Sequence, residues 1–247
     1  MSRKTAVFFF LLVFCSLRFS VQAFQFKPIA VDFSPEGKNS TRSFLVNNDG
    51  NQSIAIQVSM TTREIDIDGV ESREEAAEDF IVYPSQMILL PGEAQTVRVS
   101  WAGPPDIKKE YAYRIIGEQL PIDMREESHL ETPQGEFNIS MRYIGSVYVA
   151  PEGAKPDLTI DSAEIIKNEE GKDVLEVIFY NKGTAHSMLR DIVLEIFSKK
   201  GREAISAFSS NEVPDFNRAN ILAGAKRRIL IDWSKNLSKG EVEVILK

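Results

Sequence analysis

Hydrophobic and polar side chains alternate along much of this chain, and the clearest alternation lies near its middle. The apolar or aromatic positions there are Phe137, Ile139, Met141 and Tyr143, and the positions between them are polar. Because side chains of a β-strand point to opposite faces in turn, this pattern predicts a strand with one apolar face. The predicted strand covers residues 137–149. Its apolar face belongs either to the protein's own core or to a surface that a partner covers.

Segments rich in β-branched and aromatic residues recur between turn signals along the rest of the chain. In the first half the predicted strands are residues 29–33, 43–47, 53–61, 80–83, 96–101, 111–116 and 137–149. In the second half they are residues 158–166, 174–180, 192–197, 205–208, 227–233 and 242–246. Only residues 71–79 are helix-like, and they are too few and too acidic for more than a turn. The pattern predicts an all-β protein of two Ig-like β-sandwich domains.

The chain divides into three parts on composition. Residues 1–23 have a positive start, an apolar run and a small-x-Ala end at Ala23, which predicts a secretory signal peptide cleaved before Phe24. The apolar run is too short to span a membrane, so we expect no stable membrane insertion. Residues 151–156 contain two prolines and a glycine and predict a short linker. The predicted domains are residues 24–151 and a smaller domain at residues 157–247.

Cysteine content and charge narrow the class of protein. Cys15, the only cysteine, lies in the signal peptide and follows Phe14 rather than the small residue that a lipoprotein would need. The exported chain therefore has no disulfide, which fits a bacterial exported protein. The net charge is −7, and loss of the three positive residues of the signal peptide makes it more negative. An acidic chain is a poor nucleic-acid binder, because affinity for phosphate rests on clustered Lys and Arg.

Patterns that carry catalysis or metal binding are scarce. The two histidines, His129 and His186, have no metal-binding neighbours at the usual spacing, and no nucleophile elbow, phosphate-binding loop or dinucleotide fingerprint occurs. We therefore expect no enzyme, no cofactor and no metal. A secreted β-rich hydrolase stays open as an alternative, since a catalytic triad needs no closeness in sequence. The acidic pattern of residues 64–69 predicts a solvated strand ending in a hairpin rather than a calcium loop, and residues 71–79 a solvated loop.

Five segments, in order, resemble the periplasmic chaperones of chaperone–usher pilus assembly. They are residues 26–33 (FKPIAVDF), 42–48 (RSFLVNN), 83–99 (YPSQMILLPGEAQTVRV), 113–121 (YRIIGEQLP) and 141–149 (MRYIGSVYV). The last two look closest to the archaic branch of the family. The resemblance implies two Ig-like domains at an angle with a cleft between them, a periplasmic location, and no enzymatic activity. Its implied partners are pilus subunits and an outer-membrane usher.

The resemblance also implies a role for the strand at residues 137–149. Pilus subunits lack a closing strand, and these chaperones lend their seventh strand to the open groove by donor-strand complementation. The implied donor residues are Phe137, Ile139, Met141 and Tyr143. The alternative is that the four residues face their own domain's core. For the whole chain, the alternative is a two-domain Ig-like adhesion or surface structural module.

The family binds the C-terminal carboxylate of the subunit with an Arg on the first strand and a Lys on the seventh, and this chain departs from that pattern. Residues 28–31 contain no Arg, and Ser146 stands at the Lys position. The candidate anchors are the strand-borne cations Arg142, Lys27, Arg98 and Arg114. Arg142 is the first choice, because it lies four residues before Ser146 on the same strand face. Each cation has the alternative of a surface or intramolecular ion pair.

Overall fold

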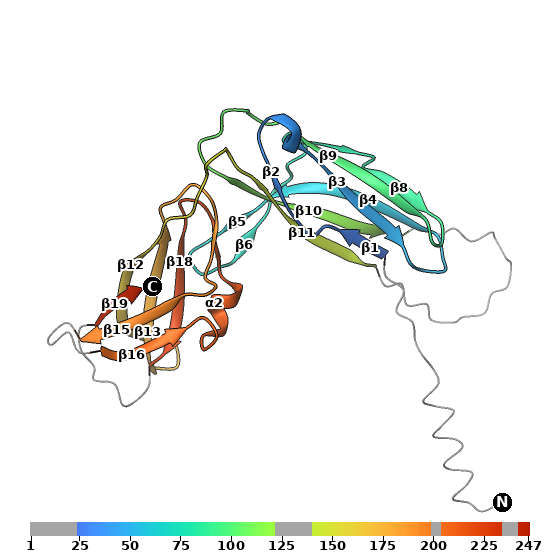
Figure 1. Ribbon diagram of the computed structural model, residues 1–247. Helices are drawn as coiled ribbons and strands as arrows, with labels where there is room; N and C mark the ends of the chain where they lie inside the picture. The colour runs from blue at the N-terminus through green and yellow to red at the C-terminus, as the bar shows by residue number, and fades with distance from the viewer. Residues whose placement is uncertain (1–23, 122–139, 199–203, 234–241) are drawn as a thin grey trace, which may run out of the picture.

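The computed structural model of the chain describes residues 24–121, 140–198, 204–233 and 242–247. These residues form two β-sandwich domains set at an angle to each other (Figure 1). Each domain has its own buried hydrophobic core, the first drawn from residues 24–149 and the second from residues 175–242. The predicted fold class is confirmed. The signal peptide predicted for residues 1–23 lies outside the described residues.

The first domain consists of two facing sheets. One contains β1 (Phe24–Lys27), β3 (Thr41–Asn48), β9 (Ala94–Trp101) and β7 (Phe80–Tyr83), in the order β1-β3-β9-β7. The other contains β2 (Ala30–Phe33), β11 (Arg142–Val149), β10 (Tyr111–Leu120), β4 (Ile54–Thr62) and β8 (Gln86–Leu89), in the order β2-β11-β10-β4-β8. The β2–β11 pair is parallel, and the other pairs are antiparallel.

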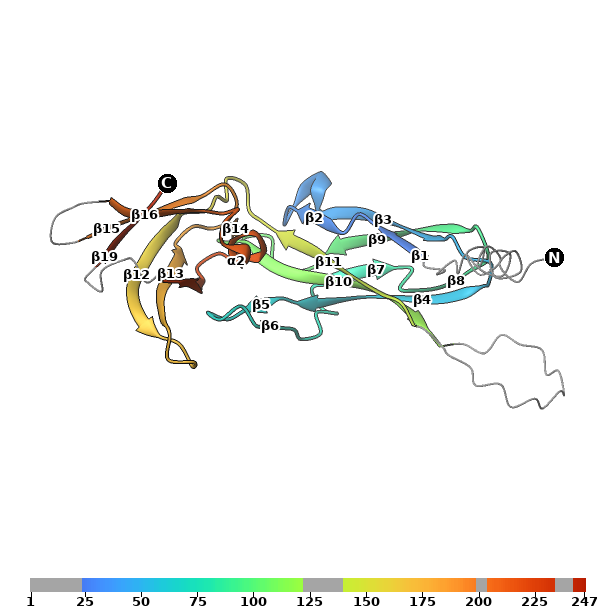
Figure 2. The same ribbon diagram turned by 90° about the horizontal axis from the view of Figure 1, so that it is seen from below.

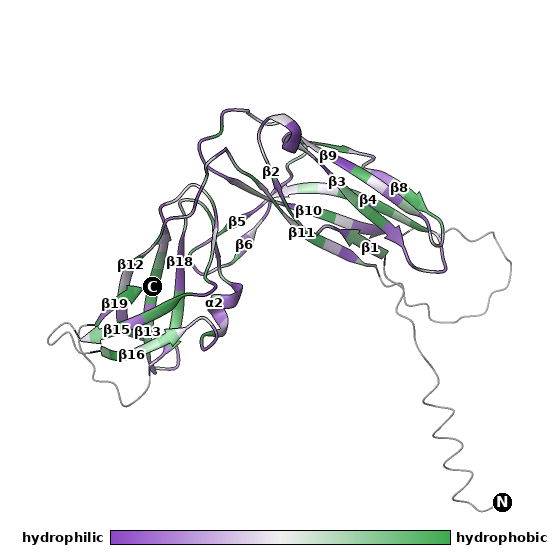
Figure 3. Cartoon of the chain, in the orientation of Figure 1, coloured by the Kyte–Doolittle hydropathy of each residue, from purple (hydrophilic) through white to green (hydrophobic). Residues whose placement is uncertain are grey.

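Alternation along the strands builds the core of the first domain. On β9, Val97, Val99 and Trp101 are buried while the residues between them face outward, and the same change of hydropathy is visible along the strands in Figure 3. Phe80 of β7 fills the centre and makes edge-on ring contacts with Trp101 and Tyr113 at 5.2 and 4.9 Å. Burial of each such side chain contributes about 1.5–3 kcal/mol. Strands β1 and β8, with four residues each, were not separately predicted.

The second domain follows the predicted strand series. One sheet contains β12 (Leu158–Lys167), β13 (Asp173–Asn181) and β18 (Lys226–Asp232), and the other β16 (Ala204–Ser209), β15 (Val193–Ser198) and β19 (Val242–Leu246). A short pair, β14 (Ser187–Met188) and β17 (Asn220–Ile221), accompanies them. The small helix α2 (Pro214–Arg218) was not predicted, since five residues are too few to show a helical period.

In each domain, a buried asparagine at the end of a strand, Asn48 or Asn181, joins neighbouring turns by hydrogen bonds; we call this arrangement a corner. The side-chain amide of Asn48 donates to the carbonyl oxygens of residues 52, 89 and 90, and its oxygen accepts the amide of Gly50. Asn181 makes the corresponding set in the second domain, with carbonyls of residues 185, 221 and 222 and amides of residues 157 and 183. The two domains therefore share a corner design as well as a fold class.

A small hairpin lies at the junction of the two domains. It is formed by β5 (Glu64–Ile65) and β6 (Glu71–Ser72), which pair antiparallel. Figures 1 and 2 both place it between the first sandwich and the second domain. The predicted hairpin after residue 64 is thus present. The expected solvated acidic face is present as well, because Glu64, Asp66 and Asp68 are exposed. The tip and the base of the hairpin also contact charged residues of both domains, as described below.

Candidate functional site: an arginine cluster at the domain junction

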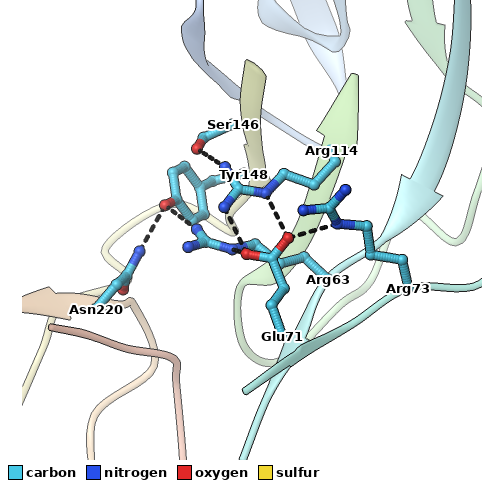
Figure 4. Close-up of polar contacts among 7 residues, drawn as sticks. All are labelled: Arg63, Glu71, Arg73, Arg114, Ser146, Tyr148 and Asn220. Carbon is cyan, nitrogen blue, oxygen red and sulfur yellow. Dashed lines mark hydrogen bonds and ion pairs between the residues drawn. The ribbon is translucent and has the colours of Figure 1, made fainter. Parts of the chain in front are cut away.

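Three arginines converge on one carboxylate where the first domain meets the second. Arg63 follows the end of β4, Arg114 lies on β10, and Arg73 follows β6, while Glu71 is the first residue of β6 (Figure 4). The strand register brings them together, because Arg114 stands opposite Ser146 of β11 on one side and Thr61 of β4 on the other. The β5–β6 hairpin then places Glu71 over these paired residues.

The contacts form a dense ionic network. Arg114 forms a two-point contact with the Glu71 carboxylate: Nε donates to Oε1 at 2.9 Å, and Nη2 donates to Oε2. Arg63 Nε donates to Oε2 at 2.9 Å, and Arg73 Nε donates to Oε1 at 2.6 Å. Such two-point pairing fixes the planes of both groups and is stronger than a single contact. Three positive charges and one negative charge leave this cluster positive overall.

The network changes the acidity of Glu71. Burial opposes ionisation of the carboxyl group, but hydrogen bonds from Arg114, Arg73 and Arg63 outweigh it and lower the pKa of Glu71 from 4.5 to about 2. The side chains of Arg63, Arg114 and Glu71 are only 9%, 16% and 16% exposed. A partly desolvated positive site of this kind favours the binding of a carboxylate.

Ser146 and Tyr148, both on β11, border the cluster. Arg114 Nη1 donates to Ser146 Oγ at 2.6 Å, and Arg63 Nη1 donates to the hydroxyl of Tyr148 at 2.8 Å. Ser146 is the position at which the family resemblance expected a lysine. The structure therefore places a cation there from the neighbouring strand β10 instead of from β11 itself.

Tyr148 joins the cluster to the second domain. Asn220 Nδ2 donates to the Tyr148 hydroxyl at 2.7 Å (Figure 4), and the Tyr148 ring stacks on His186 with centroids 3.8 Å apart. Glu110 of the first domain accepts from the His186 backbone amide at 3.0 Å, and its carboxylate lies 2.8 Å from the His186 Nδ1 atom. His186, predicted to lie in a turn without a metal role, thus forms part of the domain contact.

The tip of the β5–β6 hairpin makes the second contact between the domains. The Arg228 backbone amide of β18 donates to the carbonyl of Ile67 at 2.7 Å, and its guanidinium pairs with Asp68 at 2.7 Å. Gly69 has a φ of +85°, and a Cβ atom added there would lie 1.2 Å from a guanidinium nitrogen of Arg227. The positive φ favours glycine at this position, and a larger residue would also require the Arg227 guanidinium to move.

Strand β11 has an open edge next to the cluster. Its partner β2 pairs only with residues 146–149, so among the described residues Arg142, Tyr143, Ile144 and Gly145 have a neighbour on one side alone, strand β10. The side chains of Met141 and Tyr143 are partly buried and pack at the margin of the domain's own core, where the Tyr143 ring lies 4.8 Å from that of Phe24. The other two predicted donor residues, Phe137 and Ile139, lie outside the described residues.

The candidate anchor residues occupy different places. Arg114 lies in the arginine cluster. Arg142, the first choice from the sequence, is 53% exposed and pairs with Glu118 on the outer face of β10. Lys27 and Arg98 are exposed on β1 and β9, in the other sheet of the sandwich. Of the four candidates, Arg114 alone stands beside Ser146.

Sequence reasoning missed Arg63, Arg73, Glu71 and Tyr148. The expectation that residues 71–79 form a solvated loop is wrong for its first member, because Glu71 is bonded to three arginines. It is also wrong for Asp79, which accepts a hydrogen bond from Tyr113 at 2.9 Å. The available signal was the presence of Arg63 and Arg73 on either side of an acidic hairpin, which predicts ionic pairing across its base.

Metal-binding and membrane-spanning features are absent from the described part of the chain. No group of three or more His, Cys, Asp or Glu side chains lies close enough to hold a metal ion there. The same residues include no helix long and apolar enough to cross a membrane.

Solved structures with the same fold are numerous, and several of the most similar are fimbrial chaperones. The class 5 fimbriae chaperone CfaA matches with a TM-score of 0.57 and 19% identity over 91% of this chain and 92% of its own. The complex of CsuC with the tip adhesion subunit CsuE, from archaic chaperone–usher Csu pili of Acinetobacter baumannii, matches with a TM-score of 0.59 and 17% identity over 91% and 97%. The E. coli chaperone DraB matches with a TM-score of 0.51 and 14% identity over 92% and 96%. These likenesses establish the two-domain fold.

A sequence comparison with curated proteins gives no significant match. The family model described as "Pili and flagellar-assembly chaperone, PapD N-terminal domain" matches residues 26–155, which is more than half of the chain. That segment contains β11, the β5–β6 hairpin and all three arginines of the cluster. The chain therefore belongs to the family of pili and flagellar-assembly chaperones.

Proposed function

We propose that this protein is a periplasmic chaperone that binds pilus subunits by donor-strand complementation and delivers them to an outer-membrane usher. The observation that carries the proposal is the open edge of β11 at residues 142–145, beside the arginine cluster, in a member of this chaperone family. An exposed strand edge offers unpaired backbone groups to a second chain. In one of the similar structures, CsuC is in complex with a pilus tip subunit, which supports the choice of partner.

Two kinds of contact would hold the subunit on β11. Backbone hydrogen bonds along residues 142–145 extend the sheet, and the apolar face of the strand fills the subunit's open groove. Met141 and Tyr143 lie on that face at the margin of the chaperone's own core, and the alternation of the sequence predicts that Ile139 and Phe137 share this face. Burial of each side chain contributes about 1.5–3 kcal/mol before the cost of ordering. In this proposal Met141 and Tyr143 contact the chaperone's own core, while Ile139 and Phe137 contact the subunit.

The arginine cluster would bind the C-terminal carboxylate of the subunit. Arg114 and Arg63 lie next to Ser146, where β2 begins to pair with β11 and the open edge ends. A subunit strand that ends at this point and lies along residues 142–145 runs in the same direction as β11. The subunit strand would therefore pair with β11 in parallel, as β2 already does at residues 146–149.

The donor face is tested by co-purification of a tagged chaperone with a subunit encoded beside its gene. We expect Ile139→Asp to leave the thermal unfolding temperature unchanged and to abolish co-purification, because a buried unpaired carboxylate is costly in the groove. The matched control is Ile88→Asp, since Ile88 is 59% exposed on β8 at the other edge of the same sheet. Normal capture by the Ile139 variant contradicts strand donation, and its unfolding assigns Ile139 to the core.

The anchor is tested in the same assay with two arginine variants. We expect Arg114→Gln to weaken capture at least about tenfold, because a charge-assisted pair to a carboxylate contributes about 1.5–3 kcal/mol. Arg142→Gln is the control, since Arg142 lies on the same sheet face but pairs with Glu118. Equal capture by the wild type and the Arg114 variant removes the cluster from the proposal.

A further inference from the structure

The carboxylate site at the domain junction is already occupied by a side chain of the protein itself. Both oxygens of Glu71 accept hydrogen bonds, with Arg114 engaging the two oxygens together and Arg63 and Arg73 each engaging one. This is the geometry that a C-terminal carboxylate would adopt on Arg114. Among the carboxylates of the described residues, Glu71 alone bonds to these three arginines.

Glu71 lies on a two-stranded hairpin that belongs to neither sandwich sheet and whose tip is bonded to Arg228 of β18. Strands β5 and β6 have two residues each and pair only with each other. A two-stranded hairpin has little stability of its own. Arg114, in contrast, lies on β10, which is paired along both of its edges by β4 and β11. Displacement of Glu71 therefore requires a shift of a small hairpin, which Arg73 directly follows, and leaves Arg114 in place on β10.

The charges of the cluster favour exchange of one carboxylate for another. The site holds three arginines whose side chains are 9%, 16% and 35% exposed and a single carboxylate. A second carboxylate is attracted by the remaining positive charge, but the two-point contact with Arg114 is taken until Glu71 leaves. The apparent affinity for an incoming carboxylate is then low, because the site is free in only a small fraction of the molecules.

We infer that Glu71 is a built-in competitor, which occupies the carboxylate site of the free chaperone and is exchanged for the C-terminal carboxylate of the subunit on capture. This inference rests on the proposed function for the identity of the incoming carboxylate. Glu71 thereby decides how tightly the site binds: a carboxylate alone is held weakly, and only a ligand that also pairs with β11 displaces it. Glu71 thereby keeps the arginines ordered and neutralises part of their positive charge between successive subunits.

The competitor role predicts that removal of the Glu71 charge raises the affinity of the site for a small carboxylate. Acetate serves as the probe, and its binding is followed through the arginine Nε–H signals in NMR spectra of the full exported chain. Glu71→Gln keeps the side-chain shape but removes the competing charge, so we expect acetate to bind at least about tenfold more tightly than to the wild type. Glu118→Gln is the matched control, because it removes a carboxylate from the same domain and changes the net charge equally. We expect its acetate affinity to equal that of the wild type.

A second variant, which keeps the negative charge, tests the inference even if Glu71→Gln fails to fold. Glu71→Asp keeps the charge but shortens the side chain, so its contact with Arg114 is weaker and we expect an acetate affinity between those of the wild type and Glu71→Gln. If Glu71 instead only positions the arginines, both variants bind acetate more weakly or equally, and the inference is overturned.

Capture of a subunit by the wild type separates the two proposals. Wild-type capture with no gain in acetate affinity in either Glu71 variant overturns the competitor role alone. Tighter acetate binding by the variants, together with no subunit capture by any protein, supports the competitor role and contradicts the proposed partner.

Discussion

The stability of the first domain should depend on acid pH through one carboxylate, Glu71. Its pKa is lowered from 4.5 to about 2 in the folded protein, because the hydrogen bonds from Arg114, Arg73 and Arg63 outweigh the opposing effect of burial. A group with a depressed pKa stabilises the fold fully above its unfolded pKa. The stabilisation from Glu71 is therefore complete above about pH 5 and is lost as the pH falls towards about 2.

The size of the effect follows from the pKa change. Each pKa unit corresponds to about 1.4 kcal/mol, so the full shift from 4.5 to about 2 corresponds to about 3 kcal/mol. The Arg73 side chain is 35% exposed, and solvent screens part of the interaction. We therefore expect about 2 kcal/mol of unfolding free energy near neutral pH. Glu71→Gln, a neutral mimic of the protonated acid, should lose that amount there and little near about pH 2.

The assay needs a signal from the first domain alone. The chain has two tryptophans, Trp101 in the first core and Trp233 in the second. In a Trp233→Phe background, fluorescence during urea unfolding reports the first domain. The free energy of unfolding is compared between Glu71 and Glu71→Gln proteins at several pH values from neutral to acid. A difference that stays constant across this range would refute the assignment of the pH effect to Glu71.

Three further predictions concern packing and the domain contact. Asn181→Ala should lower the stability of the second domain by at least about 3 kcal/mol, because it leaves several buried backbone groups unpaired; a loss below about 1 kcal/mol in thermal unfolding contradicts the corner role. Gly145→Ala should cost about 1–3 kcal/mol, since the added Cβ lies 3.0 Å from the Ile29 carbonyl oxygen; an unchanged midpoint in urea unfolding argues against this close approach. Tyr148→Phe should cost about 1–2 kcal/mol and widen the range of domain angles seen by small-angle scattering, because Asn220 loses its acceptor; an identical scattering curve rules out a role in domain placement.

The strands were predictable from the sequence, because alternation is a local property of each segment. Val97, Val99 and Trp101 show it on β9, and the buried face of the strand follows from spacing alone. The resemblance of the surrounding strand aligns Ser146 with the family's lysine, and this alignment stays a prediction.

The charge beside Ser146 was not predictable from the sequence. Arg114 precedes Ser146 by 32 residues and follows Glu71 by 43 residues, and only the pairing of β10 with β11 and the path of the hairpin bring them together. The acidic composition of residues 71–79 suggested a solvated loop. Composition carries no information on the arginines that the fold brings to Glu71 from elsewhere in the chain. Arg142 was favoured for its position on β11, and its pairing with Glu118 depends on the same strand register.

The hairpin tip also has a consequence for the solubility of the second domain. In the described part of the chain, β18 is an outer strand of its sheet, and the carbonyl of Ile67 in the first domain accepts the backbone amide of Arg228 on that strand. Open strand edges recruit other chains and promote aggregation. The protein thus places a loop of its first domain against one open sheet edge of its second domain. Separation of the two domains would expose that edge, so the isolated second domain should be more prone to self-association than the whole chain.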